Sequence, residues 1–201
     1  MTATTTTRMA TAITPVRRRL AAVAALLAAA ALLGDVAVSM VDPAALDDHS
    51  QGLGRVSEGL VGVAFLLGAL ALAALVPTRG RAGRGSWWQA AGRRTWWWLA
   101  VLGLAASGLS MIGVVVTGTE PPPGLVTAEV LIALVGMVGS AVTGVRAGAW
   151  PWPVGLGVAL YLPIMFLVPL NAAFMALVWI GVAAAARRRT WRAGTTHPAV
   201  A

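Results

Sequence analysis

The chain of 201 residues contains no cysteine and no lysine, and it has only one tyrosine and two histidines. Without cysteine there is no disulfide framework, no thiolate nucleophile and no zinc cluster with cysteine ligands, and without lysine there is no Schiff-base catalysis. Charged residues make up 11% of the chain, which is well below the level of about a quarter in soluble domains. So low a charged fraction excludes an ordinary soluble globular domain.

Apolar residues dominate instead. They make up 58% of the chain, and the mean hydropathy is +0.80. This composition predicts an all-α, multi-pass integral membrane protein, because a helix satisfies its own backbone hydrogen bonds in lipid. The net charge of +8 comes from fifteen arginines against seven acids. In a membrane protein such arginines orient the chain, so we expect no nucleic-acid partner.

Apolar runs of roughly 20 residues are needed to cross the hydrocarbon core. Four runs qualify directly, at residues 20–41, 56–76, 96–117 and 125–145. The run at 152–186 is too long for one upright span, since a single helix there would be about 50 Å long. Pro169 and Asn171 favour a turn, because proline blocks the helix behind it and asparagine tolerates the left-handed conformation. The split gives spans at 152–168 and 170–186, and one long tilted helix is the alternative.

The arginines decide between five spans and six. They cluster before the first span, in the loop at 77–95, after the fourth span and after the last span, while Arg55 is the exception. If all the clusters are cytoplasmic, the number of spans is even. The sequence therefore predicts a six-helix transmembrane domain over 20–186, with basic cytoplasmic tails at 1–19 and 187–201 that we expect to be disordered. In the competing interpretation, the first helix is a signal that is cleaved.

Two further patterns concern partners. The loop at 77–95 combines five arginines with two tryptophans, which predicts contact with anionic lipid headgroups, although such arginines also act as topology signals alone. Gly136, Ser140 and Gly144 recur every four residues in the fourth span, and small residues at this spacing mark helix contacts. Packing inside the bundle is the favoured interpretation of this stripe, and a homo-oligomer or a membrane partner is the alternative.

Four charged residues near the outer side form the candidate polar cluster: Asp35, Arg55, Glu58 and Glu129. Glu58 and Glu129 each follow the start of a helix by one turn, where the helix dipole favours an anion; a shared cation or proton site is the alternative. Asp35 lies near the C-terminal end of its helix, where the dipole disfavours it, so we expect it to pair with Arg55. Asp47, Asp48 and His49 favour a solvated loop over a metal site, because adjacent side chains rarely converge on one ion.

The chain resembles the small multi-pass membrane proteins of unassigned function in high-GC actinobacteria, in stretches such as 57–60 (SEGL) and 161–166 (YLPIMF). This resemblance implies a plasma-membrane location and no particular activity. We expect no cofactor and no catalytic site, since no nucleophile, acid pair or ligand set is placed within the spans. The sequence favours a non-enzymatic bundle that senses, scaffolds or supports a partner. The alternative is a small cation- or proton-coupled transporter that uses the outer carboxylates.

Overall fold

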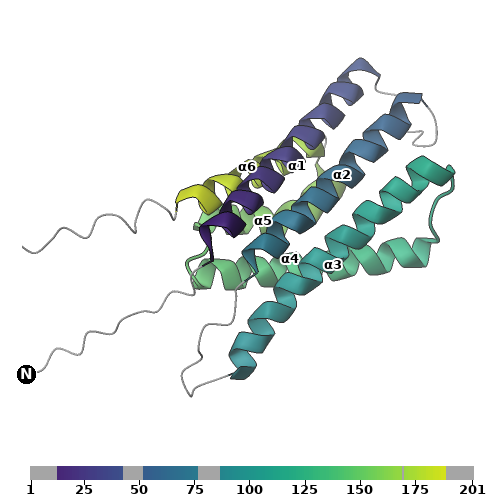
Figure 1. The fold of residues 1–201 in the computed structure, drawn as a ribbon. Coiled ribbons are helices and arrows are strands. Elements are labelled where there is room, and N and C mark those ends of the chain that lie inside the picture. The colour runs from purple at the N-terminus through teal and green to yellow at the C-terminus, as the bar shows by residue number, and fades with distance from the viewer. Residues whose placement is uncertain (1–12, 43–51, 77–86, 169, 189–201) are drawn as a thin grey trace, which may run out of the picture.

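A computed structural model describes residues 13–42, 52–76, 87–168 and 170–188, and these residues form six α-helices (Figure 1). The helices are α1 (Pro15–Val41), α2 (Gly52–Leu75), α3 (Trp87–Thr117), α4 (Pro123–Arg146), α5 (Trp152–Leu167) and α6 (Asn171–Arg188). The predicted all-α class is confirmed. Helices α1 to α4 are long and apolar enough to cross a membrane, whereas α5 and α6 are shorter.

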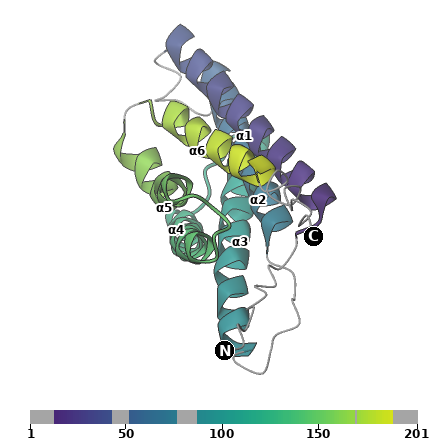
Figure 2. The same cartoon turned by 90° about the vertical axis from the view of Figure 1, so that its left-hand side faces the viewer.

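The helices pack as a ring in chain order. Each helix contacts the next one along the chain, and α6 returns to contact α1. Consecutive helices run in opposite directions, so the bundle has two ends. The termini end holds Pro15 and Arg188, and the α1–α2 end holds Val41 and Gly52. Figure 2 shows α6 lying along α1, which extends beyond it at the α1–α2 end.

Some boundaries differ from the predicted ones. Helix α1 begins at Pro15, five residues before the predicted span, because Thr14 caps the helix by accepting a hydrogen bond from the amide of Arg17, and proline is well suited to the first helical position. Helix α3 begins at Trp87, within the predicted loop at 77–95. The remaining residues of both predicted tails, and the loop residues 77–86, lie outside the described part of the chain.

The turn between α5 and α6 falls where the sequence predicts it. Val168 is the C-cap of α5, and α6 starts at Asn171. Leu170, not Asn171, adopts the positive φ of 55°. Asn171 serves the turn differently, because its side-chain amide donates a hydrogen bond to the carbonyl oxygen of Met165 near the end of α5. The run at 152–186 is therefore two helices rather than one.

Small residues bring α3 and α4 into backbone contact. A Cβ atom built on Gly136 would overlap the backbone of Ala100, and one built on Gly103 would overlap the backbone of Ala133. Ser140, one turn after Gly136, is fully buried. The small-residue stripe of α4 is thus used within the bundle, which is the interpretation that the sequence favoured.

Aromatic side chains fill the bundle where α2, α5 and α6 meet. Trp179 lies against Gly68, so closely that a Cβ atom on this glycine would overlap the indole. Its indole nitrogen donates a hydrogen bond of 2.9 Å to the hydroxyl of Tyr161, and the Tyr161 ring in turn packs against Phe65. All three aromatic side chains are buried. The polar atoms of Trp179 and Tyr161 therefore satisfy each other in the core.

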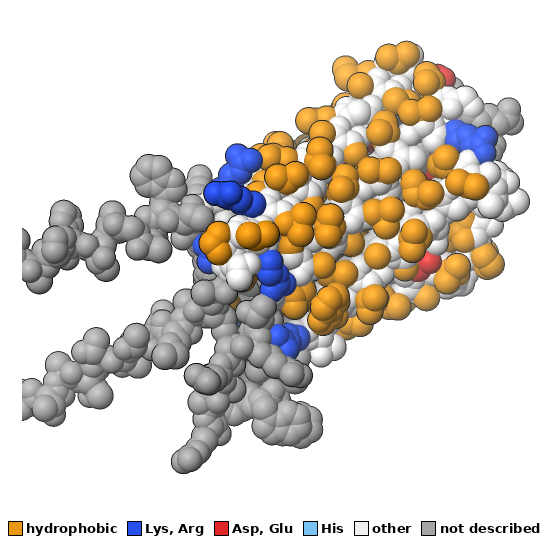
Figure 3. Space-filling model, viewed as in Figure 1, with side chains coloured by type: hydrophobic (Ala, Val, Ile, Leu, Met, Phe, Trp, Pro, Cys, Tyr) orange, Lys and Arg blue, Asp and Glu red, His pale blue; other side chains and the backbone are white. Residues whose placement is uncertain are grey.

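Charge is sorted between the two ends of the described bundle. Six arginines whose side chains are described lie at the termini end, and Arg55 alone lies at the other end; the six are Arg17, Arg18, Arg19, Arg94, Arg146 and Arg187. The described acids lie toward the α1–α2 end: Asp35, Asp42, Glu58, Glu120 and Glu129. Between the ends the visible face is covered by apolar side chains (Figure 3).

Candidate functional site

A cavity of about 250 Å³ lies inside the bundle toward the α1–α2 end, and every helix except α4 contributes to its wall. Its polar lining consists of Asp35, Ser57, Glu58 and Asn171. Its apolar lining consists of Leu32, Val61, Met111, Met165, Phe166, Ala172 and Met175. Among the described residues, no arginine or histidine lines this cavity. The cavity wall is therefore mixed, with acids as its charged groups.

Asp35 is held by a hydrogen bond across the α1–α2 contact. The hydroxyl of Ser57 donates to Oδ1 of Asp35, and both side chains are buried, with 5% of Asp35 exposed. Asp35 lies three residues after Leu32 on the buried face of α1, so the helix itself directs the carboxylate into the bundle. A carboxylate at this depth is costly without partners, and the Ser57 hydroxyl supplies one of them.

Glu58 follows Ser57 on α2 and also lines the cavity, where it is half-buried. Two of the predicted acids, one from α1 and one from α2, are thus brought to a common space. Asn171 approaches it from the α5–α6 turn, with its amide nitrogen engaged on the carbonyl of Met165. The α5–α6 turn therefore lies beside a space that is partly lined by polar side chains.

Arg55 has partners other than the predicted one. Its guanidinium donates hydrogen bonds to the carbonyl oxygens of Val115 and Val116, at the C-terminal end of α3. The last carbonyls of a helix lack partners within the helix and carry partial negative charge, which makes them good acceptors for a cation. Arg55 thus contacts α3, while the hydroxyl of Ser57 is a hydrogen-bond donor to Asp35; the expected Asp35–Arg55 pair stays a prediction.

Glu129 lies apart from the cavity. It is buried between α3 and α4, with 8% of its surface exposed, and it accepts a hydrogen bond of 2.8 Å from the hydroxyl of Ser110. Although Glu58 and Glu129 occupy equivalent positions in their helices, Glu58 lines the cavity and Glu129 is not among its lining residues. The two carboxylates therefore do not line one cavity.

Sequence reasoning did not single out Ser57 or the three cavity methionines. Ser57 precedes Glu58 and lies 22 residues after Asp35, with a single loop between their helices. This placement was the signal from which a hydrogen-bond donor to Asp35 could have been predicted. Methionine gives no comparable signal, because it is equally suited to lipid-facing and interior positions in a helix.

The described residues include no group of three or more histidines, cysteines, aspartates and glutamates that could hold a metal ion. The loop residues Asp47, Asp48 and His49 lie outside them. Comparison of the chain with protein-family models, with curated proteins and with solved structures found no match.

Proposed function

We propose that the protein is a non-enzymatic membrane protein that binds a cation in the cavity at the α1–α2 end, and that it either senses or transports this cation. The observation that carries the proposal is the position of Asp35 and Glu58 on one cavity with described walls free of basic side chains. Acidic side chains within membrane spans are costly, and they commonly mark a path or site for cations.

The proposal includes a plasma-membrane location with six spans and both termini in the cytoplasm. The sorting of described arginines to the termini end supports this orientation, since basic residues concentrate on the cytoplasmic side. The α1–α2 end and its cavity then face outward. Helices α5 and α6 cross as a pair that is shorter than the others, with their turn beside the cavity. Reporter fusions in the loop at 43–51 and after Arg188 test the topology, and an external C-terminus would contradict it.

Cation binding is tested with the full chain purified and reconstituted in liposomes. Binding and flux of Na⁺, K⁺ and tetramethylammonium are measured for the natural protein and for the Asp35→Asn and Glu58→Gln variants. Glu129→Gln is the matched control, because it also removes a buried carboxylate but lies outside the cavity. We expect binding to fall at least tenfold in the two cavity variants and to stay unchanged in the control.

The outcomes separate the candidate functions. Binding with flux indicates a transporter, and binding without flux indicates a sensor. If all four proteins fold but none binds a cation, the cation proposal fails. The function is then that of a bundle that scaffolds or supports a membrane partner.

A second surface concerns lipid. Arg17, Arg18, Arg19, Arg94 and Arg187 surround the termini end of the described bundle, where they would meet the headgroups of the inner leaflet. Each arginine near an anionic surface contributes about 1 kcal/mol. We therefore propose anionic lipid as the partner of this end, and stabilisation of the purified protein by phosphatidylglycerol over phosphatidylcholine is the measurement that tests it.

A further inference from the structure

We propose that the ligand of the cavity is an amphiphilic organic cation, which reaches the cavity from the outer leaflet past Phe166. Its cationic head would lie beside Asp35 and Glu58, and its apolar body would lie against the methionines. This inference rests on the proposed function, because it assumes that the cavity binds a cation.

The size of the cavity argues for an organic ligand. Its volume of about 250 Å³ matches that of about eight water molecules at roughly 30 Å³ each. A bare Na⁺ or Ca²⁺ ion needs several oxygen ligands drawn tightly around it, at about 2.3–2.6 Å in the case of Ca²⁺. Only four of the eleven lining residues carry polar side chains, and the side-chain amide nitrogen of Asn171 is already engaged. A compact metal ion would leave most of this space unfilled.

The chemistry of the wall argues for an apolar body attached to the charge. Met111, Met165 and Met175 reach the cavity from three different helices. Methionine side chains are flexible and polarisable, so they adapt to ligands of irregular shape. Phe166 adds an aromatic ring, and the face of such a ring attracts organic cations. A strongly hydrated inorganic ion gains little from these walls, whereas an alkylammonium ion uses both parts.

The shape of the bundle gives the route. Helix α5 has 16 residues and α1 has 27, which correspond to lengths of about 24 Å and 40 Å. The α5–α6 turn lies part of the way along α1, which extends beyond it (Figure 2), and Phe166, Asn171 and Ala172 beside this turn line the cavity. The apolar residues beside this turn are exposed: Phe166 is 60% exposed, and Leu167 and Leu170 are more exposed still. An apolar rim faces lipid rather than water, so an amphiphile is the ligand that can pass it.

The experiment uses the full chain in nanodiscs of zwitterionic lipid, with empty nanodiscs to subtract partition into the bilayer. The probes are alkyltrimethylammonium ions with chains of one to eight carbons, below their micelle concentrations. Burial of one methylene strengthens binding by about fourfold. We expect affinity to rise at least tenfold from tetramethylammonium to the octyl compound, and to fall at least tenfold in Asp35→Asn for every chain length.

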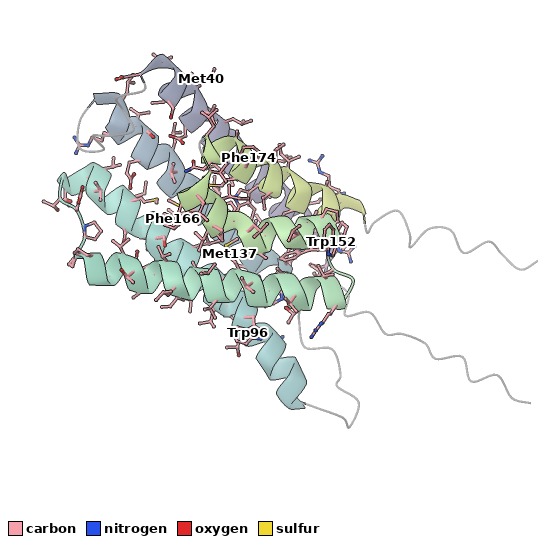
Figure 4. The ribbon with its side chains drawn as sticks, turned by 180° about the vertical axis from the view of Figure 1, so that it is seen from behind. Met40, Trp96, Met137, Trp152, Phe166 and Phe174 are labelled. Carbon is pink, nitrogen blue, oxygen red and sulfur yellow. The ribbon has the colours of Figure 1, made fainter. Side chains whose placement is uncertain are left out.

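Two phenylalanines provide a matched pair of variants. Phe166 lines the cavity, whereas Phe174 of α6 is an exposed phenylalanine that does not (Figure 4). Phe166→Ala should weaken the octyl compound more than tetramethylammonium, and Phe174→Ala should change neither. Because Phe166 is 60% exposed, we expect its truncation to leave folding intact, and the unfolding midpoint checks this.

The results distinguish this inference from the function on which it rests. If tetramethylammonium binds as tightly as the octyl compound and both require Asp35, the amphiphile is excluded and a small-cation site remains. If Ag⁺ displaces the probes and binding depends on the methionines with no effect of chain length, the cavity is a thioether metal site, which overturns the inference. If chain length matters but neither carboxylate does, the binding is non-specific partition. If no cation binds at all, the proposed function fails as well.

Discussion

The hydroxyl of Ser57 on α2 donates a hydrogen bond to the carboxylate of Asp35 on α1, inside the contact between the two helices. This bond links the buried carboxylate of Asp35 to the second turn of α2. It also fixes one wall of the cavity, since both residues line it.

Removal of this donor should destabilise the bundle. Ser57→Ala leaves Oδ1 of Asp35 without its Ser57 donor in a buried setting, which costs about 1–3 kcal/mol. We expect a lower midpoint in thermal unfolding of the detergent-solubilised protein. Ser39→Ala is the control, because the Ser39 hydroxyl donates to a carbonyl of its own helix and its loss should cost under about 0.5 kcal/mol. Equal midpoints for the two variants would contradict the role given to Ser57.

The contact between α3 and α4 predicts a difference between two glycines. Gly136→Ala places a methyl group on the backbone of Ala100, which cannot move aside as a side chain can, and overpacking of this kind costs about 1–3 kcal/mol or more. Gly113→Ala on α3 meets nothing within 4 Å and should be neutral or stabilising by up to about 1 kcal/mol, because alanine favours the helix. Reversible unfolding in mixed micelles measures both, and an unharmed Gly136→Ala protein would exclude the close approach.

The hydrogen bond between Trp179 and Tyr161 is suited to a double-mutant cycle. Tyr161→Phe keeps the ring packing but removes the acceptor for the indole N–H, and Trp179→Phe removes the donor. Hydrogen bonds between membrane helices average about 0.6 kcal/mol, so we expect a coupling free energy of about 0.5–1.5 kcal/mol from the unfolding of the two single variants and the double variant. Strict additivity would show that the bond contributes nothing to stability.

Arg17 links the start of α1 to the end of α2. Its guanidinium donates hydrogen bonds of 3.0 and 3.1 Å to the carbonyl oxygens of Ala73 and Val76, at the end of α2. Arg17→Gln should lower stability by about 1 kcal/mol, as expected when a cation is removed from the C-terminal end of a helix. Arg19→Gln removes the same charge from an exposed position and so controls for the effect of charge on topology. Both proteins should insert alike but differ in unfolding midpoint.

The fold was largely predictable, because apolar run lengths and helix breakers are local properties of the sequence. The turn near Pro169 follows from what proline and asparagine do to a helix, and the structure places it there. The first turns of α3 were not predicted, since residues 87–95 mix arginine and tryptophan in a way that gives no apolar run. Whether all six helices cross the membrane depends on the bilayer and stays a prediction.

The site was only half predictable. Asp35 and Glu58 attract notice because acids in apolar runs are rare, and they do reach one cavity. The partner of Arg55 could not be read from the sequence, since helix-terminal carbonyls are present in every helix whatever its residues. The separate position of Glu129 follows from the order of helices around the ring, which no local pattern specifies.

The contact of α6 with α1 joins an early part of the polypeptide to a late one. Helix α1 is synthesised well before Asn171–Arg188, so its alanine-rich face has only one of its two neighbours until α6 follows. Assembly is therefore completed only when the last helix is released. A chain interrupted at the α5–α6 turn would leave the side of α1 that contacts α6 uncovered.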